Sequence, residues 1–116
     1  MESFHYAIEG IFFTIKTQRN MKIHLVIGGL VVGFSLFLHI SKVDFAILLI
    51  LISLVLVSEL LNTSIEILLD MISQEYSKDI KHVKDIQAGA VFVFSMFSAI
   101  IGLLILWPYV YKFFFK

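Results

Sequence analysis

Three stretches of the 116-residue chain are apolar over nearly their whole length, at residues 23–40, 43–61 and 90–111. Each approaches the roughly 20 apolar residues that a helix needs to cross a hydrocarbon core of about 30 Å. The first two are joined by a few residues around Ser41 and Lys42, which is too few for anything but a tight helical hairpin. The pattern predicts an all-α membrane protein of one domain, residues 1–116, whose chain crosses the bilayer three times.

Two further segments show helical periodicity with polar residues between the apolar ones. The apolar positions of the first are Phe4, Ile8, Ile11, Phe12 and Ile15. They predict an amphipathic helix over residues 1–20 that lies on the membrane surface. The apolar positions of the second, within residues 62–89, are Ile65, Leu68, Leu69, Ile72, Tyr76 and Ile80. We therefore expect the second span to continue beyond the membrane as an amphipathic segment.

The charged residues predict the orientation of the three spans. Lysine and arginine are more frequent in the N-terminal segment and in residues 62–89 than at the opposite ends of the spans. By the positive-inside rule, these two segments face the cytoplasm of a multi-pass plasma-membrane protein. The nine basic and nine acidic residues cancel, so no net charge favours nucleic acid. The absence of cysteine excludes disulfides and thiolate chemistry, and the charged first twenty residues do not resemble a cleavable signal peptide.

A stripe of polar residues begins where the second apolar stretch ends. At about 100° per residue, its members share one helix face less than about 90° wide. They are Glu59, Asn62, Glu66, Asp70 and Ser73. With a rise of about 1.5 Å per residue from Val43, Glu59 lies about 24 Å along the helix, just inside the hydrocarbon boundary. A lone glutamate there could simply reach for water at a helix end, but its alignment with the others favours a functional site.

The segment from Glu59 to Asp85 combines carboxylates with lysines. Mg²⁺ prefers oxygen ligands, and it commonly takes one or two carboxylates besides water and phosphate. Lys78, Lys81 and Lys84 could stabilise a polyphosphate, although lysines beside a span are also the ordinary positive-inside signal. Together these groups favour phosphoryl transfer to a lipid hydroxyl. The chain has no P-loop and no kinase glycine loop.

The same residues resemble a known family. The chain reads "SELLNTSIEILLD" at residues 58–70, "SQEYS" at 73–77 and "KHVKDIQAGAV" at 81–91. These stretches are similar to the motifs of the small prokaryotic diacylglycerol kinase and undecaprenol kinase family, E-x-x-N-[ST]-x-I-E-x-x-x-D, then E-Y, then K-D-x-x-[AG]-A-V. The resemblance covers nearly the whole chain and implies a lipid kinase that uses ATP and Mg²⁺. It also implies a homotrimer with sites shared between subunits.

Carried over by position, the resemblance implies a role for each residue that matches a motif. Glu59 would be the general base for the lipid hydroxyl, Asn62 its neighbour, and Glu66 a ligand of the divalent cation. The nucleotide contacts would be Tyr6, Glu75, Tyr76, Ser77, Lys84 and Asp85.

The stretch "TQRNMKIH", residues 17–24, is similar to the Gram-positive branch, in which undecaprenol is the usual acceptor. The branch pattern reads E-R-N-x-K-I-H, so Gln18 stands where the family has its second metal-binding glutamate. Gln18 could still offer a carbonyl oxygen to the cation, but it brings no charge. This departure has three interpretations that the sequence leaves open: a natural variant, an engineered change or a protein of reduced activity.

Three functions remain open at this point. The first is phosphorylation of undecaprenol, and the second is phosphorylation of diacylglycerol. The third is a non-catalytic membrane protein, such as a small pore or an inactive homologue, in which the acidic stripe lines an aqueous mouth. The four histidines, His5, His24, His39 and His82, have no metal-ligand spacing, and we assign them no chemistry.

Overall fold

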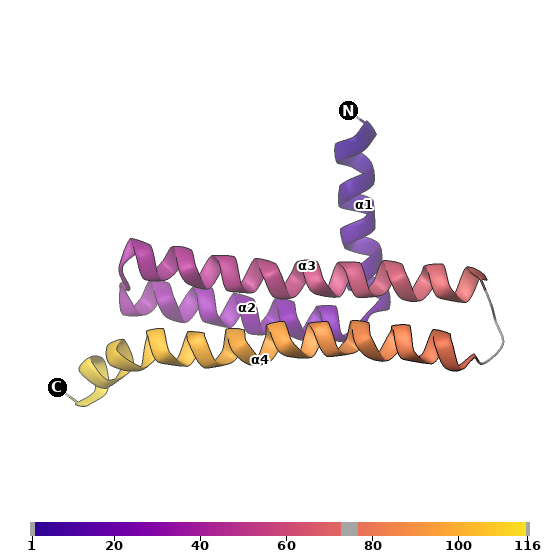
Figure 1. The fold of residues 1–116 in the computed structure, drawn as a ribbon. Coiled ribbons are helices and arrows are strands. Elements are labelled where there is room, and N and C mark those ends of the chain that lie inside the picture. The colour runs from indigo at the N-terminus through magenta and orange to yellow at the C-terminus, as the bar shows by residue number, and fades with distance from the viewer. Residues whose placement is uncertain (1, 73–76, 116) are drawn as a thin grey trace.

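The computed structural model describes residues 2–72 and 77–115, and all regular structure in these ranges is α-helical. The four helices are α1 (Glu2–Thr17), α2 (Arg19–Leu38), α3 (Lys42–Ile72) and α4 (Lys78–Phe115). Helices α2, α3 and α4 lie side by side and alternate in direction, whereas α1 projects away from this bundle (Figure 1). The junction of α1 with α2 therefore lies toward the same end of the bundle as the start of α4.

Three of the helices, α2, α3 and α4, are long and apolar enough to cross a membrane. Helix α3, with 31 residues, is longer than the apolar stretch from which the span was predicted. It continues without interruption through the polar stripe as far as Ile72. Ile80, which the periodicity placed on the same continuation, lies on α4 instead. Steps of three and four recur in both helices, so the pattern did not reveal that a new helix begins at Lys78.

The predicted helix over residues 1–20 is interrupted at Gln18. This residue has an extended backbone (φ −110°, ψ 116°), which ends α1 and redirects the chain into α2. Its N–H still donates to the carbonyl of Thr14, at 2.9 Å. Thr14 is the buried residue of α1, while Phe4 and Phe12 are exposed. Placement of α1 on the membrane surface stays a prediction.

The predicted hairpin between the first two spans is a tight turn at His39. This residue adopts the left-handed conformation (φ 55°, ψ 49°), which histidine tolerates better than most residues. Ser41 then precedes α3, and its hydroxyl accepts a hydrogen bond from the N–H of Asp44 at 3.1 Å. That bond satisfies one of the free N–H groups at the start of the helix.

Tyr109 of α4 ties the far end of the bundle to this hairpin. Its hydroxyl donates to Asp44 Oδ2 at 2.5 Å and accepts a hydrogen bond from the N–H of Ser41 at 3.2 Å. These bonds connect residues that are more than sixty positions apart in the sequence. They hold the C-terminal part of α4 against the α2–α3 turn, at the end of the bundle opposite to the polar stripe.

Few large side chains are buried inside a single chain. Met21, Leu48, Val55 and Val91 form the apolar core, and most other large apolar side chains are exposed. Such a surface is expected where lipid or another subunit, rather than water, surrounds a bundle.

Tyr109→Phe removes the phenolic hydroxyl and leaves the ring. We expect a loss of about 1–2 kcal/mol of stability, since hydrogen bonds to charged groups contribute about 1.5–3 kcal/mol and those in membrane proteins often less. Thermal unfolding in detergent micelles, followed by circular dichroism, measures the loss. The control is Tyr111→Phe, because Tyr111 is exposed and its ring packs on Trp107. Equal melting temperatures for the two variants would contradict a structural role for the Tyr109 hydroxyl.

Candidate lipid phosphorylation site

Glu59 is the most deeply buried ionisable side chain among the described residues. Only 1% of the residue is exposed, and its buried Oε2 atom has no hydrogen-bond partner within residues 2–72 and 77–115. The imidazole of His24 on α2 lies within ion-pair range, with its Nε2 3.7 Å from Glu59 Oε2. This distance is within ion-pair range but too long for a direct hydrogen bond. The carboxylate is therefore held inside the bundle with at least one oxygen free.

The other buried polar side chains around Glu59 do not satisfy this oxygen. The Ser58 hydroxyl donates to the backbone carbonyl of Val55 at 2.7 Å. The Thr63 hydroxyl donates to the backbone carbonyl of Glu59 itself at 2.9 Å. Serine and threonine often bond back to the preceding turn in this way when they lie within a helix. Their single O–H donors are thereby used.

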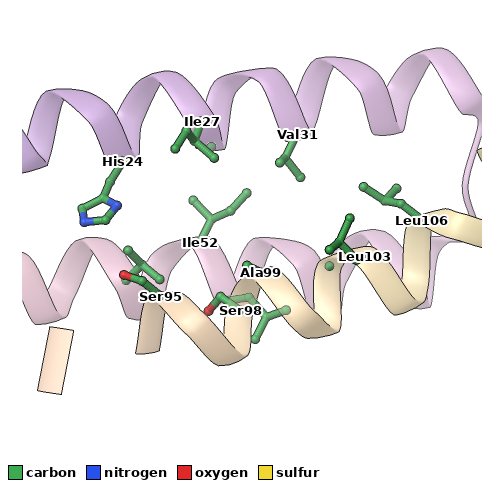
Figure 2. Close-up of a pocket in the computed structure, with 13 residues that line it drawn as sticks. His24, Ile27, Val31, Ile52, Ser95, Ser98, Ala99, Leu103 and Leu106 are labelled. Carbon is green, nitrogen blue, oxygen red and sulfur yellow. The ribbon is translucent and has the colours of Figure 1, made fainter. Parts of the chain in front are cut away.

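A cavity of about 410 Å³ lies between α2, α3 and α4, and its lining includes His24, the residue whose imidazole lies 3.7 Å from Glu59. His24 lies at one end of it and Leu106 lies toward the other, as Figure 2 shows. Most of its lining side chains are aliphatic, and the polar ones are His24, Ser95 and Ser98. The buried hydroxyl of Ser95 has no hydrogen-bond partner in the described part of the chain. The cavity thus has a long apolar body and, at one end, a small group of polar side chains.

Lys84 of α4 meets the acidic stripe farther along α3. Its Nζ donates to Asp70 Oδ1 at 2.9 Å. This hydrogen bond raises the pKa of Lys84, and the negative charges of Asp70 and Glu66 add to the effect against some desolvation. The raised pKa keeps Lys84 a cation beside two carboxylates. The sequence-predicted metal ligand Glu66 and nucleotide contact Lys84 therefore lie in one electrostatic environment.

The remaining predicted site residues are distributed over α1, α3 and the start of α4. Asn62 is half-buried on α3, one turn from Glu59. Asp85 is exposed and bonds to Lys81 at 2.6 Å, and Ser77, just before α4, accepts the N–H of Lys81 through its carbonyl. Tyr6 is 64% exposed on α1.

Glu75 and Tyr76 lie outside the described residues, as does Ser73 of the stripe. Their predicted roles stay predictions.

Tyr6 borders a separate groove between α1 and α3. This groove, of about 440 Å³, is lined on α3 by Leu60, Thr63, Ser64 and Ile67. At about 100° per residue, these positions centre roughly 110° around the helix from the polar stripe. Within one chain, α1 therefore flanks the stripe and does not cover it.

The donor groups fit Mg²⁺ only in part. Within residues 2–72 and 77–115, no three acidic or histidine side chains come together as a metal cluster. Glu66 and Asp70, one turn apart, nevertheless supply carboxylate oxygens beside Lys84. One or two carboxylates suffice for Mg²⁺ when phosphate and water complete its shell. Gln18, the second predicted ligand, lies half-buried at the α1–α2 junction.

His24 and Ser95 are site residues that the sequence analysis did not assign. Ser95 could not be recognised, because an isolated serine in an apolar helix has many ordinary uses. For His24 a signal existed: an ionisable residue within an apolar stretch marks function by default. Spacing to other metal ligands was the wrong criterion for this histidine, because its partner is a carboxylate on another helix.

Residues 5–106 match the family described as "Prokaryotic diacylglycerol kinase". An undecaprenol kinase of Bacillus subtilis is 38% identical over 107 residues, which cover 92% of this chain and 87% of the relative. A diacylglycerol kinase of Synechocystis sp. is 36% identical over 107 residues, which cover 91% of this chain but only 61% of that relative.

These matches confirm the resemblance seen in the motifs, and they confirm the prediction of a lipid kinase at the level of the family. The two relatives are named for different lipid acceptors, so their names do not determine the acceptor of this chain. What the matches establish is that the chain belongs to the prokaryotic diacylglycerol kinase family.

Proposed function

We propose that this protein phosphorylates the hydroxyl group of a membrane lipid, with ATP as the phosphate donor and Mg²⁺ as the divalent cation. One observation carries the proposal. The buried carboxylate of Glu59, with a free oxygen, lies beside the polar end of an apolar cavity that opens among the membrane-crossing helices. A lipid bound there would place its hydroxyl next to a base and its hydrocarbon chain in apolar surroundings.

The proposed reaction needs one proton acceptor and a group of charged residues that bind the polyphosphate, which we call the clamp. The lipid oxygen attacks the γ-phosphorus of ATP, and its proton passes to Glu59. The bond between the γ-phosphorus and the bridging oxygen breaks, and ADP leaves with that oxygen. Asn62, one turn from Glu59, lies on the same stripe and orients the groups around the hydroxyl.

The clamp is built from the far part of the stripe and the start of α4. Glu66 would hold Mg²⁺, which supplies positive charge to the polyphosphate when bound. Lys84 contributes a permanent cation beside it, because its hydrogen bond to Asp70 raises its pKa. Tyr6, Ser77 and Asp85, together with the residues that are not described, complete the proposed nucleotide contacts.

Undecaprenol is the acceptor that we favour. The "TQRNMKIH" stretch is similar to the Gram-positive branch, and the Bacillus subtilis relative, of which 87% is covered, is named an undecaprenol kinase. Diacylglycerol is the second candidate because the Synechocystis relative is named for it, although the chain spans under two thirds of that relative. Both lipids carry a primary hydroxyl on an apolar body.

The proposed assembly is a homotrimer in the plasma membrane with its polar stripe at the cytoplasmic side. The distribution of lysine and arginine supports this orientation. Because α1 flanks the stripe of its own chain and leaves it partly open, α1 of a neighbouring subunit could cover it. The alternative of a weakly active or non-catalytic homologue rests on one residue, Gln18.

Purified protein should transfer the γ-phosphate of labelled ATP to undecaprenol, and more slowly to diacylglycerol, in mixed micelles. Glu59→Gln keeps the size of the side chain but removes the base, so turnover should fall about 10² to 10⁴-fold. Binding of Mg-ATP, measured by calorimetry, should change little. Near-normal turnover of the variant, where chemistry limits the rate, would contradict the role of Glu59. No transfer to any lipid by the unmodified chain would favour the non-catalytic alternative.

Gln18→Glu should lower the Mg²⁺ concentration that gives half-maximal turnover and should raise the rate. The substitution adds a carboxylate at the position where the family motif has one, whereas the amide brings no charge to the cation. Kinase rates measured against Mg²⁺ concentration test this. A matched control is Asn20→Asp, which adds the same charge two positions away on the exposed surface of α2. If the two variants have equal effects, a general surface charge rather than a metal ligand explains the result.

A further inference from the structure

We propose that His24 is a positioning residue that fixes the orientation of the Glu59 carboxylate for its role as the base. This inference rests on the proposed function, since it assigns a role in the same site. It stands on the arrangement of α2 and α3. His24 Nε2 lies 3.7 Å from Glu59 Oε2, and that oxygen is buried with no hydrogen-bond partner.

A base must keep a fixed direction toward the hydroxyl whose proton it accepts. Glu59 Oε2 is buried, and no donor among the described residues holds it. Donation from an imidazole N–H to this oxygen would fix the carboxylate and direct its second oxygen toward the hydroxyl. A small rotation of either side chain, or one bridging water, closes the distance of 3.7 Å.

No other cation in the described structure is placed to do this. Lys84 of α4 bonds to Asp70 and is influenced by Glu66, the next carboxylate along α3. Where α4 borders the cavity, it presents the uncharged Ser95. Helix α1 buries only Thr14, and its Lys16 is exposed. Among the described residues, His24 is thus the basic group within 4.0 Å of Glu59.

Helix α2 packs closely on α3 one turn beyond His24. Gly28 is buried there. A Cβ added to Gly28 would lie 3.0 Å from Ile52 Cγ2, so a side chain at this position would require Ile52 to shift. The His24 imidazole itself is 18% exposed and lines the cavity next to this contact.

Two substitutions of His24 test whether its imidazole acts as a hydrogen-bond donor to Glu59. Glutamine places an N–H donor near the position of Nε2 but cannot carry a positive charge, and leucine provides no donor. His24→Leu should lower kcat about 10 to 100-fold, the range for the loss of a hydrogen bond to a charged group, with little change in KM for Mg-ATP. His24→Gln should restore most of kcat, because the amide N–H can take the place of the imidazole N–H.

The control is His82→Leu, which makes the same change at an exposed position of α4. Elution volume and helical content should be compared for all variants, to show that each is folded. If both His24 variants retain the unmodified kcat, or if both lose kcat equally, the positioning role is wrong. Glu59→Gln is measured in the same assay. If the Glu59→Gln variant stays active, or if the unmodified protein is inactive, the proposed function itself fails. The His24 result tests the positioning role when the unmodified protein is active and the Glu59→Gln variant is not.

Discussion

Burial of the Glu59 carboxylate is the constraint on which the rest of the site depends. Removing a carboxylate from water costs several kcal/mol unless other groups compensate, and within a membrane-crossing helix such residues usually serve function. Here the neighbouring hydroxyls of Ser58 and Thr63 are used by the backbone, and one carboxylate oxygen has no partner. The fold thus holds a carboxylate with a free oxygen close to an apolar cavity. A base that acts on a lipid hydroxyl needs both a free oxygen and apolar space for the lipid chain.

The two ends of the bundle differ in the interactions that they contain. At one end Tyr109, Asp44 and Ser41 form a closed hydrogen-bonded group that ties α4 to the α2–α3 turn. At the other end charged groups lie on the surface, where Lys84 meets Asp70. The cavity runs between them, with its polar end toward the charged groups. The hydrogen-bonded end holds α4 against the α2–α3 turn, whereas the charged end leaves Asp70 exposed.

The sequence was sufficient for features that depend on one helix at a time. Three apolar stretches predicted three spans, and the spacing of Glu59, Glu66 and Asp70 placed them on one face of a helix that the structure contains. Features that depend on two helices could not be predicted. The contact of His24 with Glu59 joins positions 35 residues apart, and no period in the sequence reports it. The start of a new helix at Lys78 was missed because apolar residues at steps of three and four occur on both sides of it, and the first helix ends at Thr17 rather than at the predicted residue 20.

The central claim is that the lipid hydroxyl reaches Glu59 through the cavity between α2, α3 and α4. It can be tested with a long-chain primary alcohol that carries a diazirine close to the hydroxyl. After irradiation with the purified protein, mass spectrometry of peptides locates the attached label. The account predicts labelling around His24, Glu59 and Ser95, and competition by excess undecaprenol. Labelling confined to the groove between α1 and α3, around Tyr6 and Ile67, would contradict it.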